Sequence, residues 1–262
     1  MLQAGAWNDV DFSLMVHAGP GADLRCADVR TQAVARFDVT FHGTSGHAGA
    51  PSPHGQNATN AATIGLVGLG LLRQHLPDGV RANAFVSEGG EATNIIASAT
   101  RVSAEVRADT VASVEIARRR MLACFEGGAV ATGCAWSWEE TEPIYAEVVQ
   151  NAVLARAWDR NLATLGRMPQ PYAGGPGGST DMGNVSQVVP SIHPLIALHG
   201  CASAPHTPEF TADSVGLAAE AAVIDGALAM ALTAADAVAH LRAGGTLVRP
   251  EDGDAGEYHG RY

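Results

Sequence analysis

Charged side chains are scarce in this sequence, and basic ones are the scarcer kind. They make up 16% of the 262 residues, and 16 Lys and Arg stand against 27 Asp and Glu, for a formal net charge of -11. Proteins that bind nucleic acids concentrate Lys and Arg to replace the counterions of the phosphates. The composition therefore argues against a nucleic-acid partner. With 47% hydrophobic residues, the chain can bury one large core or two modest ones.

Long uninterrupted apolar runs are also missing. The most apolar stretch, residues 215–232, contains Glu220 and Asp225, and ionisable side chains are costly at the centre of a bilayer. The N-terminal residues show no basic segment followed by an apolar one, so we expect no signal peptide. The four cysteines form no CxxC pair, which excludes a zinc ribbon and favours buried thiols in a reducing compartment. We therefore expect a cytoplasmic protein without a membrane partner.

The compact motifs of common hydrolases are absent as well. The sequence contains no HExxH or HxD zinc motif, no GxxxxGK[ST] phosphate loop and no GxSxG nucleophile elbow. Ser179 lies in Gly178-Ser179-Thr180-Asp181, which is a different pattern. A serine hydrolase built on Ser179 is therefore a remote alternative.

Residues 30–142 show strands and helices in alternation. Apolar residues at 37, 39 and 41 alternate with polar ones, as in a half-buried strand. The other elements predicted here are a helix at 58–76, strands at 83–87 and 100–107, a helix at 111–125 capped by Asp109 and closed by Gly127-Gly128, and a strand at 134–138. The order β-α-β-β-α-β is typical of a ferredoxin-like α+β domain.

The flanking segments, residues 1–29 and 143–241, are predicted to form an α/β domain that carries residues 30–142 as an insertion. Its predicted elements are a strand at 10–17, a helix at 146–165, a strand at 194–198 and a helix at 214–241. Residues 242–262 are polar and rich in Gly, and they are predicted to form a loose tail.

Ten histidines are the main chemical signal. Imidazole is the commonest metal ligand and the usual acid or base near neutral pH. His17 ends a predicted strand, and His47 and His206 lie in loops beside Gly or Pro, where site residues tend to be presented. Taken singly, each is more often a hydrogen-bonded structural residue than a ligand. The roles of His193 and His199 stay open.

Several phrases together resemble the zinc amidohydrolases of peptidase family M20, which includes aminoacylases, carboxypeptidases and aminobenzoyl-glutamate hydrolases. The phrases are DFSLMVH at 11–17, FHGTSGHA at 41–48, GQNA at 55–58, TNII at 93–96, VR at 106–107, GSTDMGNVS at 178–186, VPSIHP at 189–194 and HTPEF at 206–210. Their order and intervals resemble the family from about residue 9 to residue 238.

This resemblance implies an α/β metallohydrolase domain with an inserted ferredoxin-like lid, through which two subunits form a homodimer. It implies two divalent metal ions, zinc in the first place, with manganese or cobalt as alternatives. His17 and His206 would each ligate one ion, and His47 would polarise the scissile carbonyl in the active site of the partner. The substrate, a small amide, would contact the remaining set, which is Asn94, Arg107, Gly178, Ser179 and Asp181.

One part of the family pattern is missing. In the family, a first His-containing motif, the bridging metal ligand and a glutamate pair precede the position of His17, and nothing before His17 in this sequence can replace them. We therefore expect an incomplete, truncated metallohydrolase, which needs the missing part to hydrolyse N-acyl amino acids or small dipeptide-like substrates. The alternative is a non-catalytic dimerisation or binding module.

Overall fold

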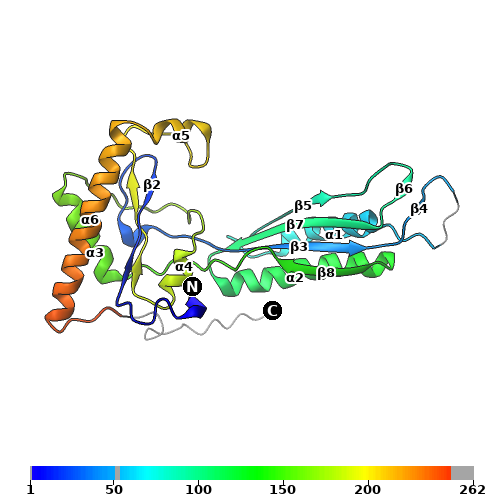
Figure 1. Ribbon diagram of the computed structural model, residues 1–262, viewed down its shortest axis with the longest axis horizontal. Coiled ribbons are helices and arrows are strands. Elements are labelled where there is room, and N and C mark those ends of the chain that lie inside the picture. Colours follow the sequence, from blue (N-terminus) through cyan, green and yellow to red (C-terminus); the bar gives the residue numbers. More distant parts are fainter. Residues whose placement is uncertain (1, 51–53, 249–262) are drawn as a thin grey trace. The chain divides into compact units, whose positions relative to one another are not determined.

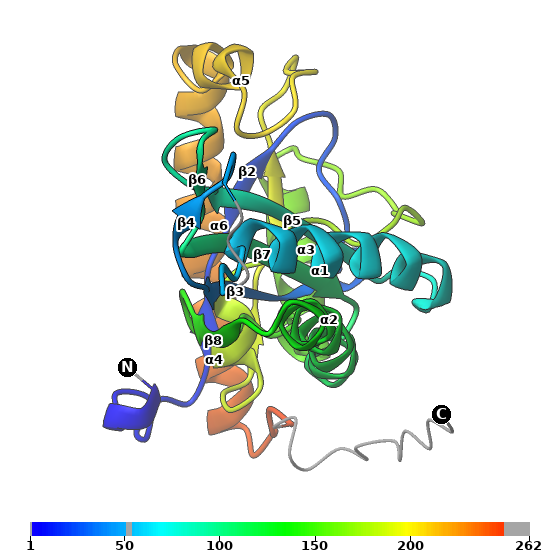
Figure 2. The same cartoon turned by 90° about the vertical axis from the view of Figure 1, so that its right-hand side faces the viewer.

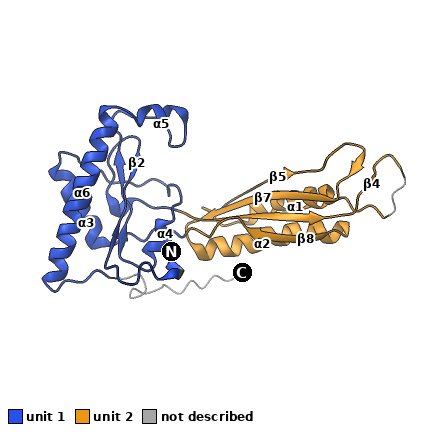
Figure 3. Ribbon diagram, viewed as in Figure 1, with its two compact units in different colours: residues 1–31, 146–262 blue, residues 32–145 orange. Residues whose placement is uncertain are grey.

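The computed structural model describes residues 2–50 and 54–248 and divides into two compact units (Figure 1, Figure 3). Unit 2 comprises Gln32–Tyr145, and unit 1 comprises the described residues up to Thr31 and from Ala146 onward. The sequence prediction placed the divisions after residues 29 and 142. Most of the predicted tail, residues 249–262, lies outside the described residues.

Unit 2 is built on a four-stranded antiparallel sheet with the strand order β5-β7-β3-β8. The strands are β3 (Ala33–His42), β5 (Arg81–Glu88), β7 (Ala99–Ala108) and β8 (Ala135–Glu140). Phe37, Val39 and Phe41 of β3 are buried, and the residues between them are only partly buried. This alternation follows from the two-residue period of a strand, and it places one face of the sheet against the core.

Helices α1 (Ala58–Leu72) and α2 (Val111–Thr132) lie side by side on one face of this sheet (Figure 2). A Cβ atom at Gly128 of α2 would lie 2.2 Å from the backbone oxygen of Ala61 in α1. Gly128 therefore permits the close approach of the two helices. The sequence predicted that this helix ends at Gly127-Gly128, and that prediction is wrong. Gly128 serves the packing of α2 on α1, and α2 continues to Thr132. The β-α-β-β-α-β order confirms the ferredoxin-like fold predicted for this segment.

Three other predicted helix ends are wrong. The N-cap of α2 is Thr110 rather than Asp109, since its hydroxyl accepts a hydrogen bond from the N–H of Ser113. The α-helical part of α1 ends at Leu72 rather than at residue 76, and a 3-10 turn, η3 (Arg73–His75), follows it. Helix α3 (Ala152–Thr164) begins after its cap Asn151, and not near residue 146, because Gln150 already pairs with Ser191 in a parallel β-bridge.

Unit 1 contains two short parallel strand pairs. β1 (Ser13–Leu14) pairs with β9 (Ser191–Ile192), and β2 (His17–Gly19) pairs with β10 (Leu195–Ala197). The strand predicted at residues 10–17 is thus two strands. Besides α3, the helical elements of unit 1 are η1 (Leu2–Ala4), η2 (Cys26–Asp28), α4 (Met182–Ser186), α5 (Pro208–Asp213) and α6 (Leu217–Arg242).

The core of unit 1 lies between the strand pairs and the helices α3 and α6, which pack against each other. Its largest fully buried side chains come from α3 and β9: Leu154, Trp158, Leu162 and Ile192. Burial of each such side chain stabilises the fold by roughly 1.5–3 kcal/mol. Because Ile192 in β9 is part of this core, the packing also fixes the chain just before residue 193.

A buried ion-pair network fixes β10. Arg167 and Asp23 are 4% and 3% exposed. Arg167 donates to a carboxylate oxygen of Asp23 at 3.1 Å, to Asp225 of α6 at 2.8 Å and to the backbone oxygen of Ala197 at 3.0 Å. Asp23 in turn accepts from the N–H of Ala197 at 2.8 Å and from the ring of His199 at 3.1 Å. Both backbone polar groups of Ala197 are therefore satisfied by side chains.

Helix α6 is long and apolar enough to cross a membrane by length and composition alone, and 28% of its most apolar window is buried. One such helix is weak evidence, because a core helix passes the same test. Asp225 of α6 takes part in the Arg167 network, and α6 packs on α3. These contacts make α6 an element of the unit 1 fold.

Candidate metal centre and lid residues

His17 is positioned by the pairing of β2 with β10. Its N–H donates to the carbonyl oxygen of Pro194 at 3.1 Å, and its ring is exposed. The Nδ1 atom lies 2.6 Å from the carbonyl oxygen of Ala18. A carbonyl oxygen only accepts, so Nδ1 carries the proton, and the neutral ring presents a lone pair on Nε2. This is the form in which an imidazole ligates a metal ion.

His193 lies next to His17, with the two ring centroids 6.2 Å apart and the ring planes inclined by 59°. The residue is 6% exposed, and neither Nδ1 nor Nε2 has a hydrogen-bond partner. Burial, with a further contribution from His17, lowers the pKa of His193 to about 4, although the carboxylate of Asp181 acts in the opposite direction. His193 is therefore a neutral imidazole near physiological pH.

The loop before α4 contains Gly178, Ser179 and Asp181. The position of its end is fixed by Gly183, where a Cβ atom would lie 1.8 Å from the backbone oxygen of Ala146. Asp181 is exposed, and its charge reaches His193. The carboxylate of Asp181 is thus near enough to His193 for its charge to act on that ring.

His206 lies on an exposed turn just before α5. Its φ is 66°, and among the described residues it is the single non-glycine residue with a positive φ. Thr207 caps α5 by accepting a hydrogen bond from the N–H of Phe210. A left-handed backbone is unfavourable for a residue with a Cβ atom, and such strain gathers at functional sites. The observation agrees with a functional role of His206 but does not place it beside His17.

His47 and Asn94 lie together in unit 2. β4 (Gly46–His47) pairs antiparallel with β6 (Ile95–Ile96), and the N–H of Ala48 donates to the backbone oxygen of Asn94 at 2.9 Å (Figure 1). The Nδ1 atom of His47 accepts a hydrogen bond from the N–H of Gly49 at 3.0 Å. The neutral ring therefore carries its proton on the exposed Nε2 and can donate it to an acceptor such as a carbonyl oxygen.

Arg107 is not part of that group. It stands in β7 opposite Val34 and Arg81, eight residues beyond Ala99 at the other end of the strand. Its guanidinium holds the carboxylate of Glu105 in a two-pronged ion pair, with N–O distances of 2.6 and 3.1 Å. Arg36 binds the same carboxylate at 2.6 Å. These contacts give Arg107 a structural role within the sheet.

The described residues do not form a complete metal site by themselves. Across residues 2–50 and 54–248, no group of three or more His, Cys, Asp and Glu side chains lies close enough to hold a metal ion. A tetrahedral zinc ion needs about four donors, and His17 and His206 supply two at most. The donors present therefore do not fit the two-metal centre that the resemblance implies unless further ligands join them.

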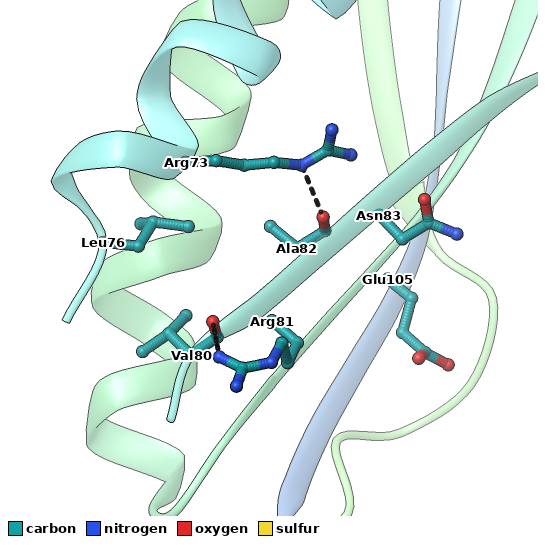
Figure 4. A pocket seen from close by; sticks show the side chains of 7 residues that line it. All are labelled: Arg73, Leu76, Val80, Arg81, Ala82, Asn83 and Glu105. Carbon is teal, nitrogen blue, oxygen red and sulfur yellow. Dashed lines mark hydrogen bonds between the residues drawn. The ribbon is translucent and has the colours of Figure 1, made fainter. Parts of the chain in front are cut away.

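A pocket of about 390 Å³ lies in unit 2, beside the edge strand β5 (Figure 4). Arg73 and Arg81 reach into it, but each donates to a backbone oxygen, of Ala82 and Val80 respectively. The other lining residues include Asn83 and Glu105, and none of the predicted site residues is among them. The pocket is nevertheless next to Arg107, because Glu105, which lines it, is the ion-pair partner of Arg107.

The residue that the sequence left undecided, His193, is the one whose surroundings are most unusual. Its backbone is held by the side chain of Gln150, which accepts from the His193 N–H at 2.9 Å and donates to the His193 carbonyl at 3.2 Å. Only the pairing of segments far apart in the sequence brings His17, Gln150 and His193 together. No local pattern could have indicated this arrangement.

Known proteins are similar to this chain in sequence. Residues 29–132 match the family model described as a peptidase dimerisation domain. The chain is 32% identical over 243 residues to the Xaa-Arg dipeptidase of Mus musculus, and the match covers 91% of this chain and 55% of that protein. It is also 32% identical over 110 residues to one chain of the p-aminobenzoyl-glutamate hydrolase of Escherichia coli, covering 41% of this chain and 25% of the relative. The chain thus spans about half the length of the dipeptidase.

The arrangement of an inserted dimerisation domain within an α/β unit is similar to that of solved metallohydrolase structures. A solved structure from Bacillus subtilis, described as a dinuclear metal-binding peptidase of the M20 family, has a TM-score of 0.60 and 18% identity, covering 89% of this chain and 59% of that one. The chain is related to the M20 family, and the recognition made from the sequence is confirmed.

Proposed function

We propose that this chain is part of a metal-dependent amidohydrolase that cleaves the amide bond of N-acyl amino acids or small dipeptide-like substrates. The observation that carries the proposal is the similarity to a dipeptidase over 91% of the chain. The orientation of His17 supports it, because the hydrogen bond at Nδ1 leaves Nε2 available to a metal ion. The similarity to a p-aminobenzoyl-glutamate hydrolase also supports an amide bond as the target.

In this proposal His17 and His206 are metal ligands, and the native ions are zinc, with manganese or cobalt as alternatives. Such ions polarise a carbonyl oxygen and lower the pKa of a bound water. His47 donates to the carbonyl oxygen of the substrate, where negative charge develops. The proposed substrate contacts are Asn94, Arg107, Gly178, Ser179 and Asp181. Among these contacts, the substrate-binding role of Arg107 has the weakest support, since its guanidinium already donates to the carboxylate of Glu105.

Hydrolysis also needs donors that the described residues do not provide. The bridging ligand and the general base would come from elsewhere, in a longer polypeptide or a second chain. The dimerisation domain suggests that the chain forms a homodimer, and we propose that unit 2 forms the contact. A cytoplasmic location is proposed because all four cysteines are free thiols in the structure.

The test is hydrolysis of N-acetyl amino acids and dipeptides, measured in the presence of Zn²⁺, Mn²⁺ or Co²⁺. The assay compares this chain alone with the same chain joined to the coding sequence upstream of residue 1. We expect metal-dependent release of the free amino acid from the longer protein. A metal-free, inactive longer protein that still forms a dimer would instead support the non-catalytic dimerisation module.

A further inference from the structure

Helix α6 differs from an ordinary surface helix because it is apolar on two opposite sides. Its inner side consists of the buried residues Ala219, Ala222, Gly226, Ala229, Thr233 and Ala237. A Cβ atom at Gly226 would lie 3.5 Å from a side-chain atom of Ile196 and 3.6 Å from one of Val16. The inner side of α6 therefore packs on the strands of unit 1.

The other side of α6 carries a second apolar stripe, here called the outer stripe. Its members follow one another at intervals of four and three residues in alternation: Leu217, Ala221, Ile224, Leu228, Ala231 and Ala235. All six are exposed, and Leu217, Ile224 and Leu228 are 86%, 60% and 46% exposed. In a helix with 3.6 residues per turn, this spacing keeps the six side chains in one row, opposite the buried side.

The spacing of the outer stripe is that of helix–helix packing. Apolar residues that recur every 3.5 residues on average form the seam along which two helices interdigitate. The three alanines of the stripe permit a close approach of a second helix. An open hollow of about 760 Å³ continues the stripe toward the end of α6, lined by Ala234, Ala235, Val238, Ala239, Arg242 and Ala243. The outer stripe therefore fits another helix that is apolar on one side.

Unit 1 also lacks neighbours at its strands. In the part of the chain that the structure describes, β1 pairs with β9 alone and β2 with β10 alone. Parallel strands normally belong to larger sheets that are covered on both faces. The match to the dipeptidase covers 91% of this chain but 55% of that protein, which leaves 45% of the dipeptidase without a counterpart here. A longer polypeptide of that kind contains enough residues to cover α6.

Two other occupants fit the outer stripe less well. A second copy of the chain has its proposed contact surface on unit 2, which matches a dimerisation domain. A lipid bilayer would have to accept Glu220 and Asp236, which are exposed on the same helix. Ionisable side chains are costly in hydrocarbon.

We propose that the outer stripe of α6 is the docking surface for an amphipathic α-helix encoded upstream of residue 1 in the longer polypeptide. That helix carries apolar side chains at the same spacing and packs them between those of the outer stripe. The inference rests on the proposed function in one respect, since both take the chain as part of a longer polypeptide. It involves neither metal ions nor hydrolysis.

Thiol labelling tests the docking without an assay of activity. Leu228→Cys places a thiol on the outer stripe, and Val130→Cys places a control thiol on α2, where Val130 is 78% exposed. Each variant is made in this chain alone and in the same chain joined to the upstream coding sequence. Peptide mass spectrometry then follows the reaction of the introduced thiol with N-ethylmaleimide. We expect both thiols to react readily in this chain alone. In the longer protein the reaction at residue 228 should be at least tenfold slower, and that at residue 130 unchanged.

A charge on the outer stripe gives a second measurement. Leu228→Glu should change the melting temperature of this chain alone by less than about 2 °C, because the new carboxylate reaches solvent. In the longer protein the same substitution should lower the melting temperature by roughly 5 °C or more, since the docked helix buries the carboxylate without a partner. Val130→Glu is the control and should leave both melting temperatures unchanged.

Equal labelling at residue 228 in the two proteins, with no loss of melting temperature in the longer Leu228→Glu protein, would overturn the inference. If that longer protein still hydrolysed amides, the proposed function would stand. Protection of residue 228 in an inactive longer protein would support the docking and contradict the function alone. Protection in this chain alone that grows with protein concentration would show a second copy on the stripe. Protection that appears only with phosphatidylcholine vesicles would show a lipid surface, and either of these two results would overturn the inference.

Discussion

The backbone oxygen of Asn94 accepts a hydrogen bond of 2.9 Å from Ala48, which places Asn94 directly beside His47 at one end of unit 2. Arg107 lies eight residues beyond the start of β7 at Ala99, a distance of about 27 Å along a strand. Within one protomer, His47 and Asn94 can therefore contact the same small molecule, and Arg107 cannot join them. Substitutions at His47 or Asn94 and substitutions at Arg107 therefore affect opposite ends of unit 2.

The ion pairs of Glu105 predict a specific pH dependence. Burial alone would raise the pKa of Glu105, but hydrogen bonds from Arg107 and Arg36 outweigh it and hold the pKa below the usual 4.5. A carboxylate with a lowered folded-state pKa stabilises the fold above its unfolded-state pKa and loses that effect as the pH falls through the folded value. Urea unfolding at pH 6 and pH 3 should therefore show a larger loss of stability in the wild type than in Glu105→Gln. Equal losses would contradict this account of the ion pairs.

Two neighbouring glycines of α2 are expected to respond in opposite ways to alanine. A Cβ atom at Gly128 would lie 2.2 Å from the backbone oxygen of Ala61, whereas a Cβ atom at Gly127 would meet nothing within 4 Å. We expect Gly128→Ala to lower the free energy of unfolding by about 1–3 kcal/mol through overpacking. Gly127→Ala should raise it by about 0.5–1 kcal/mol, because alanine is the better helix former. Urea denaturation measures both, and effects of the same sign would refute the packing of α1 on α2.

The buried network of Arg167 predicts a large loss of stability on truncation. Arg167→Ala leaves the carboxylate of Asp23 buried without its partner, and removal of one member of such a pair costs about 3–5 kcal/mol. Arg160 offers a matched control, since its pair with Asp236 is 3.6 Å long and the Arg160 side chain is 65% exposed. Arg160→Ala should change the stability by less than about 1 kcal/mol. Thermal and urea unfolding decide the case, and similar effects of the two variants would show that the network contributes little.

The left-handed backbone of His206 predicts a gain in stability from glycine. Because a Cβ atom is unfavourable at φ 66°, His206→Gly should stabilise the chain by about 1 kcal/mol. Ala204→Gly is the control, as Ala204 has a negative φ and should lose about 0.5 kcal/mol. In the longer protein the same His206→Gly change should abolish hydrolysis. A less stable but fully active variant would remove His206 from the proposed centre.

The inserted domain could be predicted from sequence because its signals are local. Alternation at residues 37–41 and the β-α-β-β-α-β order are sufficient for a ferredoxin-like unit. The ends of α2 could not be predicted, because the role of Gly128 depends on Ala61, a residue of another helix. Local sequence indicates that a helix ends at such a glycine, but here the packing of α2 against α1 keeps the helix continuous through Gly128.

The site was predictable only in part, for a similar reason. His17, His47 and His206 were singled out by phrases that resemble a known family, and their roles remain predictions. His193 carried no local signal that separates a ligand from a structural histidine. Its relation to His17 arises from the pairing of β2 with β10, segments more than 170 residues apart in the chain.

Metal-dependent hydrolysis by the longer protein, compared among His17→Gln, His206→Gln and His240→Gln, tests the central claim most directly. The account predicts that the first two variants lose activity by at least a hundredfold and bind less than the full complement of metal, whereas His240→Gln behaves like the wild type. Full activity and metal content in both His17→Gln and His206→Gln would contradict it.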